Sequence, residues 1–396
     1  MSSLPRIRQS PTDKDFVQNP YPYYAEWRAL GDFVFWEDFA KPMATAHEAV
    51  RAVMTSKSLG REVPKEHQVP VRAGLEPFNA LEAHSMLELE PPRHTRLRGL
   101  VLRAFTRNRI LYLAPDVSQI ADALISEFPN GEFDLLSHFA QKLPVVVIAR
   151  LLGVPEETAP HLLAWSNAMV SMYQARKTPE IEDAAARAAG EFTAFMRNHI
   201  EARRSTPGDD LMSLLIAAES EGDRLSLDEM VSPCILLLTA GHEATVHSIG
   251  NAVRYLADYD DRQTALEPEQ IERTVEECLR FDPPLHMFTR HVYEDIVLRD
   301  HAFKRGEEIG CLLGSACHDA AVWPDGKNFH PFRDVRSHAA FGAGSLFCVG
   351  APLARLELQI ALPILFARCP NLRVTERPRV ANLYHFRGLE RLKVSN

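Results

Sequence analysis

The chain has 396 residues, of which 46% are hydrophobic, and a formal net charge of -9. Its length alone would suggest two or three domains and is enough to bury a large core. The negative charge argues against nucleic-acid binding, the absence of a run of about 18 apolar residues against a membrane-spanning helix, and six cysteines without paired spacing against a disulfide framework or a zinc site.

The first part of the chain predicts short strands and an amphipathic segment. The stretch from Met1 to Arg6 lacks the apolar core of a signal peptide, so we expect a cytoplasmic protein. Residues 33–36 read as a strand, and most of the middle of the chain reads as helix. Residues 143–154 predict a buried helix closed by Gly153, although their β-branched residues would also suit a core strand.

The longest predicted helix begins at Ser226 and runs towards Leu256. Ser226 and Glu229 have the spacing of a capping box, and apolar residues follow them. Pro233 is unexpected there, because it removes one backbone hydrogen bond. After about residue 285, short β-like runs separated by glycine and proline predict strands. The pattern as a whole indicates a mainly α protein with small β-sheets.

Cys348 is the most informative residue of the C-terminal part. It lies in a loop, residues 341–350, whose glycines at 342, 344 and 350 allow tight turns and close approach to a flat cofactor. The amides of Val349, Gly350 and Ala351 open the helix that follows, and the positive end of a helix favours a thiolate over a thiol. A thiolate in such a loop predicts an iron ligand.

The loop has the pattern FxxGxxxCxG and resembles the ligand loop of the cytochromes P450, the haem-thiolate monooxygenases. Further similar segments are 91–98, 240–245, 277–284, 289–291 and 329–333, so that the likeness extends from Asn19 to Arg391. The resemblance implies one haem domain over residues 1–396, with a long central helix over the haem and β-rich N-terminal and C-terminal portions. It also implies haem b as the cofactor, Cys348 as the iron ligand, and Phe341, Gly342 and Gly350 as parts of the cofactor-binding loop.

The same resemblance assigns charged residues to two roles. Glu277 and Arg280 match the family's ExxR pair, and Arg333 matches the arginine that joins it; all three would lock the cysteine loop in place. His94, Arg98 and Arg290 match the donors to the haem propionates. Leu346 departs from the family, because the residue two positions before the cysteine is normally histidine or arginine. One propionate would then be held by water or by another donor.

Residues 240–245 resemble the oxygen-binding segment of the central helix. Ala240 and the glycine after it would leave room for dioxygen, and Glu243 would be the acid that delivers protons. Ala244 occupies the position of the family's usual threonine, and Thr245 lies about 100° further round the helix. Three readings stay open: a water chain through Glu243 and Thr245, a hydroxyl supplied by the substrate, or poorly coupled turnover. Thr245 could equally bond its own backbone.

The resemblance also gives a mainly apolar substrate lining made of Leu236, Thr239, Ala240, His286 and Phe288. The implied activity is insertion of one atom of dioxygen into a small organic substrate, by hydroxylation or O-dealkylation. Electrons would come from a separate ferredoxin or flavodoxin with its NAD(P)H-dependent reductase, and we expect a monomer. Ala244 motivates one alternative, a peroxide-driven enzyme, and Ala244 with Leu346 motivates another, a haem-binding sensor without turnover.

Overall fold

The computed structural model of the protein describes residues 4–174, 177–220, 225–335 and 337–396. The chain divides into two compact units. The first unit comprises Met1–Gln68, His247–Cys348 and Asn371–Asn396, and the second comprises Val69–Val246 and Val349–Pro370. The fold is mainly α with small sheets, as predicted, whereas a single domain over residues 1–396 stays a prediction. None of the helices formed by the described residues is long and apolar enough to cross a membrane.

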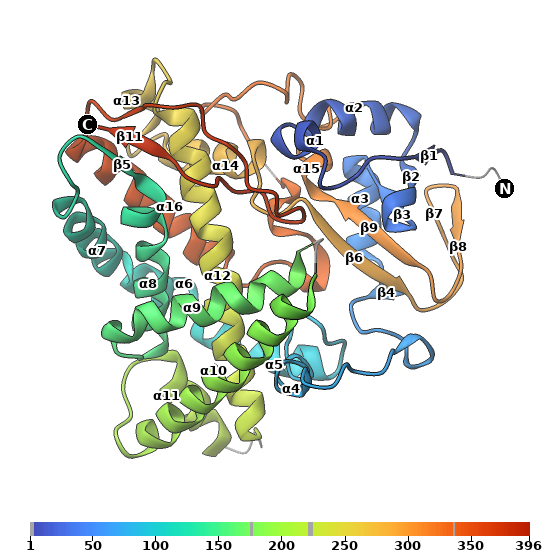
Figure 1. The fold of residues 1–396 in the computed structure, drawn as a ribbon, viewed down its shortest axis with the longest axis horizontal. Helices are drawn as coiled ribbons and strands as arrows, with labels where there is room; N and C mark the ends of the chain where they lie inside the picture. The colour runs from blue at the N-terminus through green and yellow to red at the C-terminus, as the bar shows by residue number, and fades with distance from the viewer. Residues whose placement is uncertain (1–3, 175–176, 221–224, 336) are drawn as a thin grey trace. The chain divides into compact units, whose positions relative to one another are not determined.

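The first unit is built around a six-stranded sheet with the order β1-β2-β3-β9-β6-β4 (Figure 1). β1 pairs parallel to β2 and β3 parallel to β9, and the other neighbours are antiparallel. The strands of this sheet are β1 Arg6–Ile7, β2 Phe33–Trp36, β3 Lys41–Ala44, β4 Leu59–Gly60, β6 Met287–Val292 and β9 Glu308–Leu312. The unit also contains two antiparallel strand pairs, β7 Ile296–Leu298 with β8 His301–Phe303, and β10 Arg373–Val374 with β11 Lys393–Ser395.

The helices of the first unit are short apart from α14 and the end of α12. Their bounds are α1 Lys14–Gln18, α2 Tyr21–Leu30, α3 His47–Thr55, α13 Arg262–Ala265, α14 Ile271–Phe281 and α15 Leu313–Ala316, with single turns at η1 Glu37–Phe39, η2 Lys65–His67, η6 Ala339–Phe341 and η7 Gly344–Leu346. One core cluster joins α3, the sheet and the turn η6, and includes Val50, Leu59, Cys311 and Ala340. This core therefore carries the segment that leads to Cys348.

The second unit is almost entirely helical. Its elements are α4 Glu76–Glu82, α5 Arg93–Ala104, α6 Arg107–Tyr112, α7 Ala114–Ser126, β5 Glu132–Asp134, η3 Leu136–Ala140, α8 Lys142–Leu152, η4 Glu156–Thr158, α9 Ala159–Val170, η5 Ser171–Tyr173, α10 Pro179–Ser205, α11 Leu211–Ser220 and α16 Ala351–Arg368. α16 packs against α7, and α10 packs against α9 and α4 (Figure 1). The long helix α12, Leu227–Leu256, contributes residues up to Val246 to this unit.

Two predictions about helices are confirmed by local geometry. Most of residues 143–154 lie in the helix α8, Lys142–Leu152, which is closed by Gly153 with φ +73°, so the strand alternative was wrong there. At the start of α12, the Ser226 amide donates to the Glu229 carboxylate at 3.0 Å and the Glu229 amide donates to the Ser226 hydroxyl at 3.2 Å. The capping box is therefore formed, and the helix continues through Pro233.

A buried carboxylate ties together distant parts of the first unit. Asp282 is 1% exposed, forms an ion pair with Arg387, and accepts hydrogen bonds from the Tyr21 hydroxyl at 2.6 Å and the Tyr255 hydroxyl at 2.9 Å. Burial would raise the pKa of Asp282, but the charge of Arg387 and the Tyr21 hydroxyl outweigh it and hold the pKa below its ordinary value. Arg387 also donates to the Val17 carbonyl at 3.0 Å.

We predict that Arg387→Met lowers the free energy of unfolding by about 3–5 kcal/mol, because Asp282 would keep a buried charge without its cation. Denaturant unfolding measures the loss. The control is Arg368→Met, which removes the arginine of a half-exposed pair with Asp122 and should cost only about 0–1 kcal/mol. Equal losses in the two variants would contradict the role given to the buried pair.

Candidate functional site

Cys348 differs from the other five cysteines, all of which the structure describes, because it is exposed and they are buried. Its amide donates to the Phe341 carbonyl at 3.0 Å, and the Phe347 amide donates to the Gly344 carbonyl at 3.1 Å. The loop therefore turns back on itself, with Gly342 at φ +71° and Gly344 at φ +73°. α16 begins at Ala351, three residues further along the chain.

The glycines of this loop are required by a neighbouring helix end. A Cβ atom on Gly344 would lie 2.7 Å from the Met54 carbonyl oxygen and 3.2 Å from the Thr55 Cα, and one on Gly342 would lie 3.2 Å from the Met54 methyl. Both contacts are with the last residues of α3. The sequence predicted close approach to a cofactor; the structure shows close approach of the loop to the backbone of α3, which a side chain at 344 would prevent.

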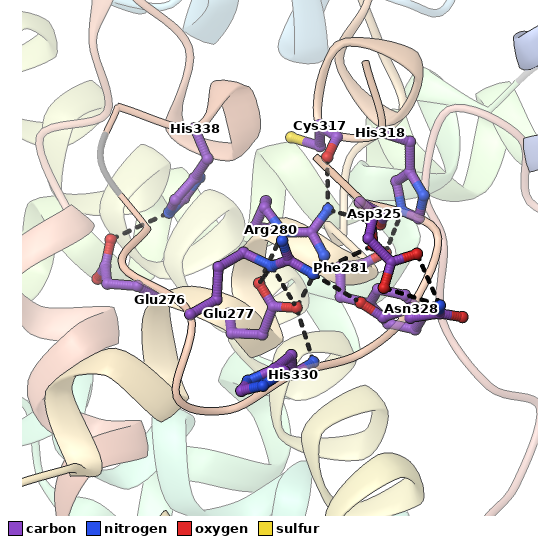
Figure 2. Close-up of polar contacts among 12 residues, drawn as sticks. Glu276, Glu277, Arg280, Phe281, Cys317, His318, Asp325, Asn328, His330 and His338 are labelled. Carbon is purple, nitrogen blue, oxygen red and sulfur yellow. Dashed lines mark hydrogen bonds and ion pairs between the residues drawn. The ribbon is translucent and has the colours of Figure 1, made fainter. Parts of the chain in front are cut away.

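Glu277 and Arg280 form a fully buried pair on α14 (Figure 2). The Arg280 Nε donates to Glu277 Oε2 at 2.7 Å and its Nη2 donates to Oε1 at 2.8 Å. Arg280 Nη1 donates to the Cys317 carbonyl at 2.6 Å and to the Gly326 carbonyl at 3.0 Å. A buried ion pair is stable only when its remaining hydrogen-bonding capacity is used, and this pair uses it to hold two loops.

Arg333 contacts the same carboxylate. Its Nε lies 3.3 Å from the Glu277 carboxylate, and its guanidinium donates to the Pro324 carbonyl at 2.7 Å and to the Asn328 carbonyl at 3.2 Å. The His330 amide donates to Glu277 Oε1 at 2.9 Å. The structure thus brings Glu277, Arg280 and Arg333 together and fixes residues 324–333, the segment that precedes the cysteine loop.

A second contact from α14, which sequence reasoning missed, reaches the turn that leads into the cysteine loop. The His338 Nε2 lies 3.1 Å from the Glu276 carboxylate, as Figure 2 shows, and the His338 Nδ1 accepts from the Ala340 amide at 3.2 Å. His338 thereby caps the turn η6, which ends at Phe341. Because the Phe341 carbonyl accepts from the Cys348 amide, Glu276 and His338 position the cysteine through three consecutive contacts.

Between residues 230 and 246 of α12, the four side chains that are not buried form one stripe at helical spacing. Ala240 is exposed, and Leu236, Glu243 and Ala244 are partly buried, whereas Thr239 and Thr245 are only 6% and 4% exposed. Residues i, i+4, i+7 and i+8 lie on the same face of a helix. Three of the predicted lining and oxygen-segment residues therefore share this stripe with Glu243, the only ionisable residue on it between 236 and 244.

Both threonines near the stripe bond their own backbone. The Thr245 hydroxyl donates to the Gly241 carbonyl at 2.7 Å, and the Thr239 hydroxyl donates to the Ile235 carbonyl at 3.0 Å. This geometry is the alternative that the sequence left open for Thr245. It also differs from the lining role expected of Thr239, because its hydroxyl is buried and already used. Gly241 faces α8, where a Cβ atom would lie 3.0 Å from the Ile148 methyl.

His94 and Arg98 on α5 form a site suited to a carboxylate. His94 is 2% exposed, and its Nε2 is buried without a hydrogen-bond partner among the described residues. Burial lowers the pKa of His94, and the positive charge of Arg98 lowers it further. A neutral imidazole can still donate one hydrogen bond, and a buried donor requires a partner. These two residues therefore fit the propionate-binding role that the resemblance gave them.

The remaining predicted residues lie in the first unit, on or next to β6. Arg290 is 3% exposed and donates to the Thr289 carbonyl at 2.8 Å, and Phe288 is partly buried. His286 is placed differently from the prediction. It is 1% exposed, its Nδ1 lies 3.0 Å from the Tyr24 hydroxyl, and burial lowers its pKa far below the ordinary value. His286 belongs to a buried tyrosine cluster, so its placement does not support a substrate-contacting role.

Comparison with known proteins identifies the family. The sequence model named Cytochrome P450 matches residues 45–377. The cytochrome P450 monooxygenase PikC of Streptomyces venezuelae is 33% identical over 99% of this chain and 95% of its own length, and the 6-deoxyerythronolide B hydroxylase of Saccharopolyspora erythraea is 34% identical over 83% of each. The solved structure of P450BioI, in complex with a hexadec-9Z-enoic acid ligated acyl carrier protein, is similar with a TM-score of 0.90 and 30% identity, covering 96% of this chain and 99% of that one.

We predict that Gly344→Ala destabilises the protein by about 1–3 kcal/mol more than Gly74→Ala, because its Cβ atom collides with backbone that cannot move freely. Gly74 is a matched control, since it has φ +93° and no atom within 4 Å of an added Cβ. Both variants carry the strain of a positive φ, of about 1 kcal/mol. Denaturant unfolding compares them, and equal destabilisation would show that the contact with α3 is unimportant.

Proposed function

This chain belongs to the cytochrome P450 family and is a haem b protein of the monooxygenase class, and we propose that Cys348 supplies the thiolate that binds the haem iron. The observation that carries the proposal is the exposure of Cys348, in a loop fixed from α14, while the other five cysteines are buried. Haem held by a thiolate, when bound, activates dioxygen for transfer of one oxygen atom to the substrate.

The chain's own donors would then hold the haem carboxylates. His94 offers a buried Nε2 donor, with the guanidinium of Arg98 close enough to affect its titration. Arg290 offers a buried guanidinium on the first unit. Carboxylates taken out of water need charged or hydrogen-bonding partners in fixed positions, and these three side chains supply both.

We assign the substrate to small, mainly apolar organic molecules that are hydroxylated or O-dealkylated. The accessible stripe of α12 supports this assignment, because Leu236, Ala240 and Ala244 are apolar and Glu243 is the one ionisable group among them. Relatives include a mycinamicin IV hydroxylase/epoxidase and a vitamin D(3) 25-hydroxylase. We also propose electron supply from a separate ferredoxin or flavodoxin with its NAD(P)H-dependent reductase, for a monomeric enzyme in the cytoplasm.

Glu243 is the proposed proton source for oxygen activation. Its side chain is 18% exposed on the stripe, while the hydroxyl of Thr245 is committed to the Gly241 carbonyl. Ala244 offers no hydroxyl between the acid and the substrate. Of the readings left open by the sequence, a hydroxyl carried by the substrate therefore has the most support, because the chain's nearest hydroxyl faces its own backbone.

We predict that Cys348→Ser abolishes the carbon-monoxide band that is typical of thiolate ligation in the reduced protein, because a serine hydroxyl is a far weaker iron ligand than a thiolate. The absorption spectrum of the reduced carbonyl form measures it. Cys369→Ser, at a buried cysteine, is the control and should keep the band. Retention of the band in Cys348→Ser would show that another residue binds the iron.

We predict that Ala244→Thr changes the ratio of product to NAD(P)H consumed by about fivefold, the effect of one hydrogen bond of about 1 kcal/mol. The ratio should rise for a substrate without a hydroxyl near the oxidised carbon and fall for one that carries it. A compound panel screened by the shift in haem spin state supplies both substrates.

The control for this prediction is Thr245→Ala, which removes a hydroxyl bonded to the Gly241 carbonyl. It should leave the ratio as in the wild type. A large change in Thr245→Ala, with none in Ala244→Thr, would show that protons pass through Thr245 instead.

A further inference from the structure

Arg61 follows the strand β4 directly and lies near Arg290 of the neighbouring strand β6. In the antiparallel pair of β4 and β6, Leu59 lies opposite Val292 and Gly60 lies opposite His291. Arg61 is the next residue after this paired segment, and Arg290 is the next residue of β6 beyond His291. Like charges held close together repel each other, so this arrangement calls for a physical reason.

The two guanidinium groups converge on one residue. Arg290 Nη1 donates to the Thr289 carbonyl at 2.8 Å, and Arg61 Nη1 lies 3.3 Å from the same oxygen and 3.3 Å from the Thr289 hydroxyl. Two cations that share a carbonyl oxygen lie within a few ångströms of each other. The Arg61 guanidinium also lies 5.8 Å from the centroid of the Phe288 ring.

A buried thiol lies close to both charges. Cys311, on β9, lies opposite Phe288 in the register of β6 and β9. Burial raises the pKa of Cys311 to about 11, and the positive charges of Arg290 and Arg61 both oppose the rise. The carboxylate of Glu308, which lies opposite His291 in the same register, forms an ion pair with Lys41.

The pair also belongs to the same core as the cysteine loop. Leu59, two residues before Arg61, is buried in the cluster that contains Ala339 and Ala340, and Phe288 and Ala343 pack against that cluster. β4 and β6 are therefore fixed to the same core as the turns that precede Cys348. An anion bound by the two arginines would be held against that core.

We propose that Arg61 and Arg290 together bind one carboxylate of the haem, and that Arg61 supplies the donor that this chain lacks at Leu346. The proposal rests on haem binding through Cys348 and on the role of Arg290 given above. A carboxylate placed between two guanidiniums accepts charge-assisted hydrogen bonds from both. It would also remove the repulsion between the two arginines, which accounts for their closeness.

The test compares haem with its dimethyl ester, in which both carboxylates are neutral. The holoprotein is stripped and reconstituted with either form, and the rate of transfer to apomyoglobin is measured for the wild type, Arg61→Gln and Arg61→Lys. For ordinary haem, Arg61→Gln should release the cofactor about ten- to a hundredfold faster, as expected for a lost hydrogen bond to a charged group. For the dimethyl ester, the wild type and Arg61→Gln should release it at equal rates.

Two further measurements distinguish a lost charge at the haem carboxylate from a weakened strand pair. Arg61→Lys keeps the positive charge and should lie between the wild type and Arg61→Gln. The midpoint potential of the iron should fall in Arg61→Gln, because a lost positive charge disfavours the reduced form. Arg28→Gln is the control, since Arg28 is a partly buried arginine of the same unit that donates to the Ser315 carbonyl at 2.9 Å; it should not change haem release.

Three outcomes would overturn the proposal: equal acceleration of release for haem and its ester, no acceleration at all, or the same acceleration in Arg28→Gln. The first would mean that Arg61 only supports the strands. Failure of haem-thiolate binding itself would be recognised separately, because the wild-type protein would then lack the thiolate spectrum before any variant is compared.

Discussion

The buried carboxylate of Glu277 is the constraint on which the rest of the site depends. It is fully excluded from water together with Arg280, and a charge in that position must have all its hydrogen bonds satisfied. Arg280, Arg333 and the His330 amide satisfy it, and the arginines in turn hold backbone carbonyls of the preceding loops. The charge of one side chain thus determines where residues 317–333 run, and the preceding residue, Glu276, positions the cysteine loop through His338.

Sequence predicted the parts of this structure that are set by local interactions. The capping box at Ser226 and Glu229 and the glycine end of α8 follow from residues within one helical turn. The charged pair on α14 was implied by the resemblance to the family's ExxR pair, because i, i+3 spacing alone fits a solvated pair equally well. Contacts such as Glu276 with His338, 62 residues apart, leave no periodic signal. The closeness of Arg61 to Arg290 depends on the register of β4 and β6, which two short segments of sequence cannot specify.

Polar residues within apolar runs were the least predictable. Thr239 satisfies its hydroxyl on its own helix, and His286 satisfies its ring nitrogens among buried tyrosines, so neither is required to face a substrate. The residue type gives the hydrogen-bonding capacity, but only the tertiary structure shows which partner uses it. The same reasoning applies to Gly344, whose lack of a side chain is needed by the backbone of α3, a neighbour that the sequence does not reveal.

The stripe on α12 carries few side chains that can exchange a proton. Along it, Leu236, Ala240 and Ala244 offer no hydrogen bonds from their side chains, and Glu243 is the remaining group that can exchange a proton. A carboxylate next to apolar groups can give up a proton only if water or a substrate hydroxyl reaches it. Because Thr245 bonds the Gly241 carbonyl, the chain does not provide that hydroxyl at the expected position. The efficiency of oxygen transfer should therefore depend on the substrate more than it would in a relative with threonine at this position.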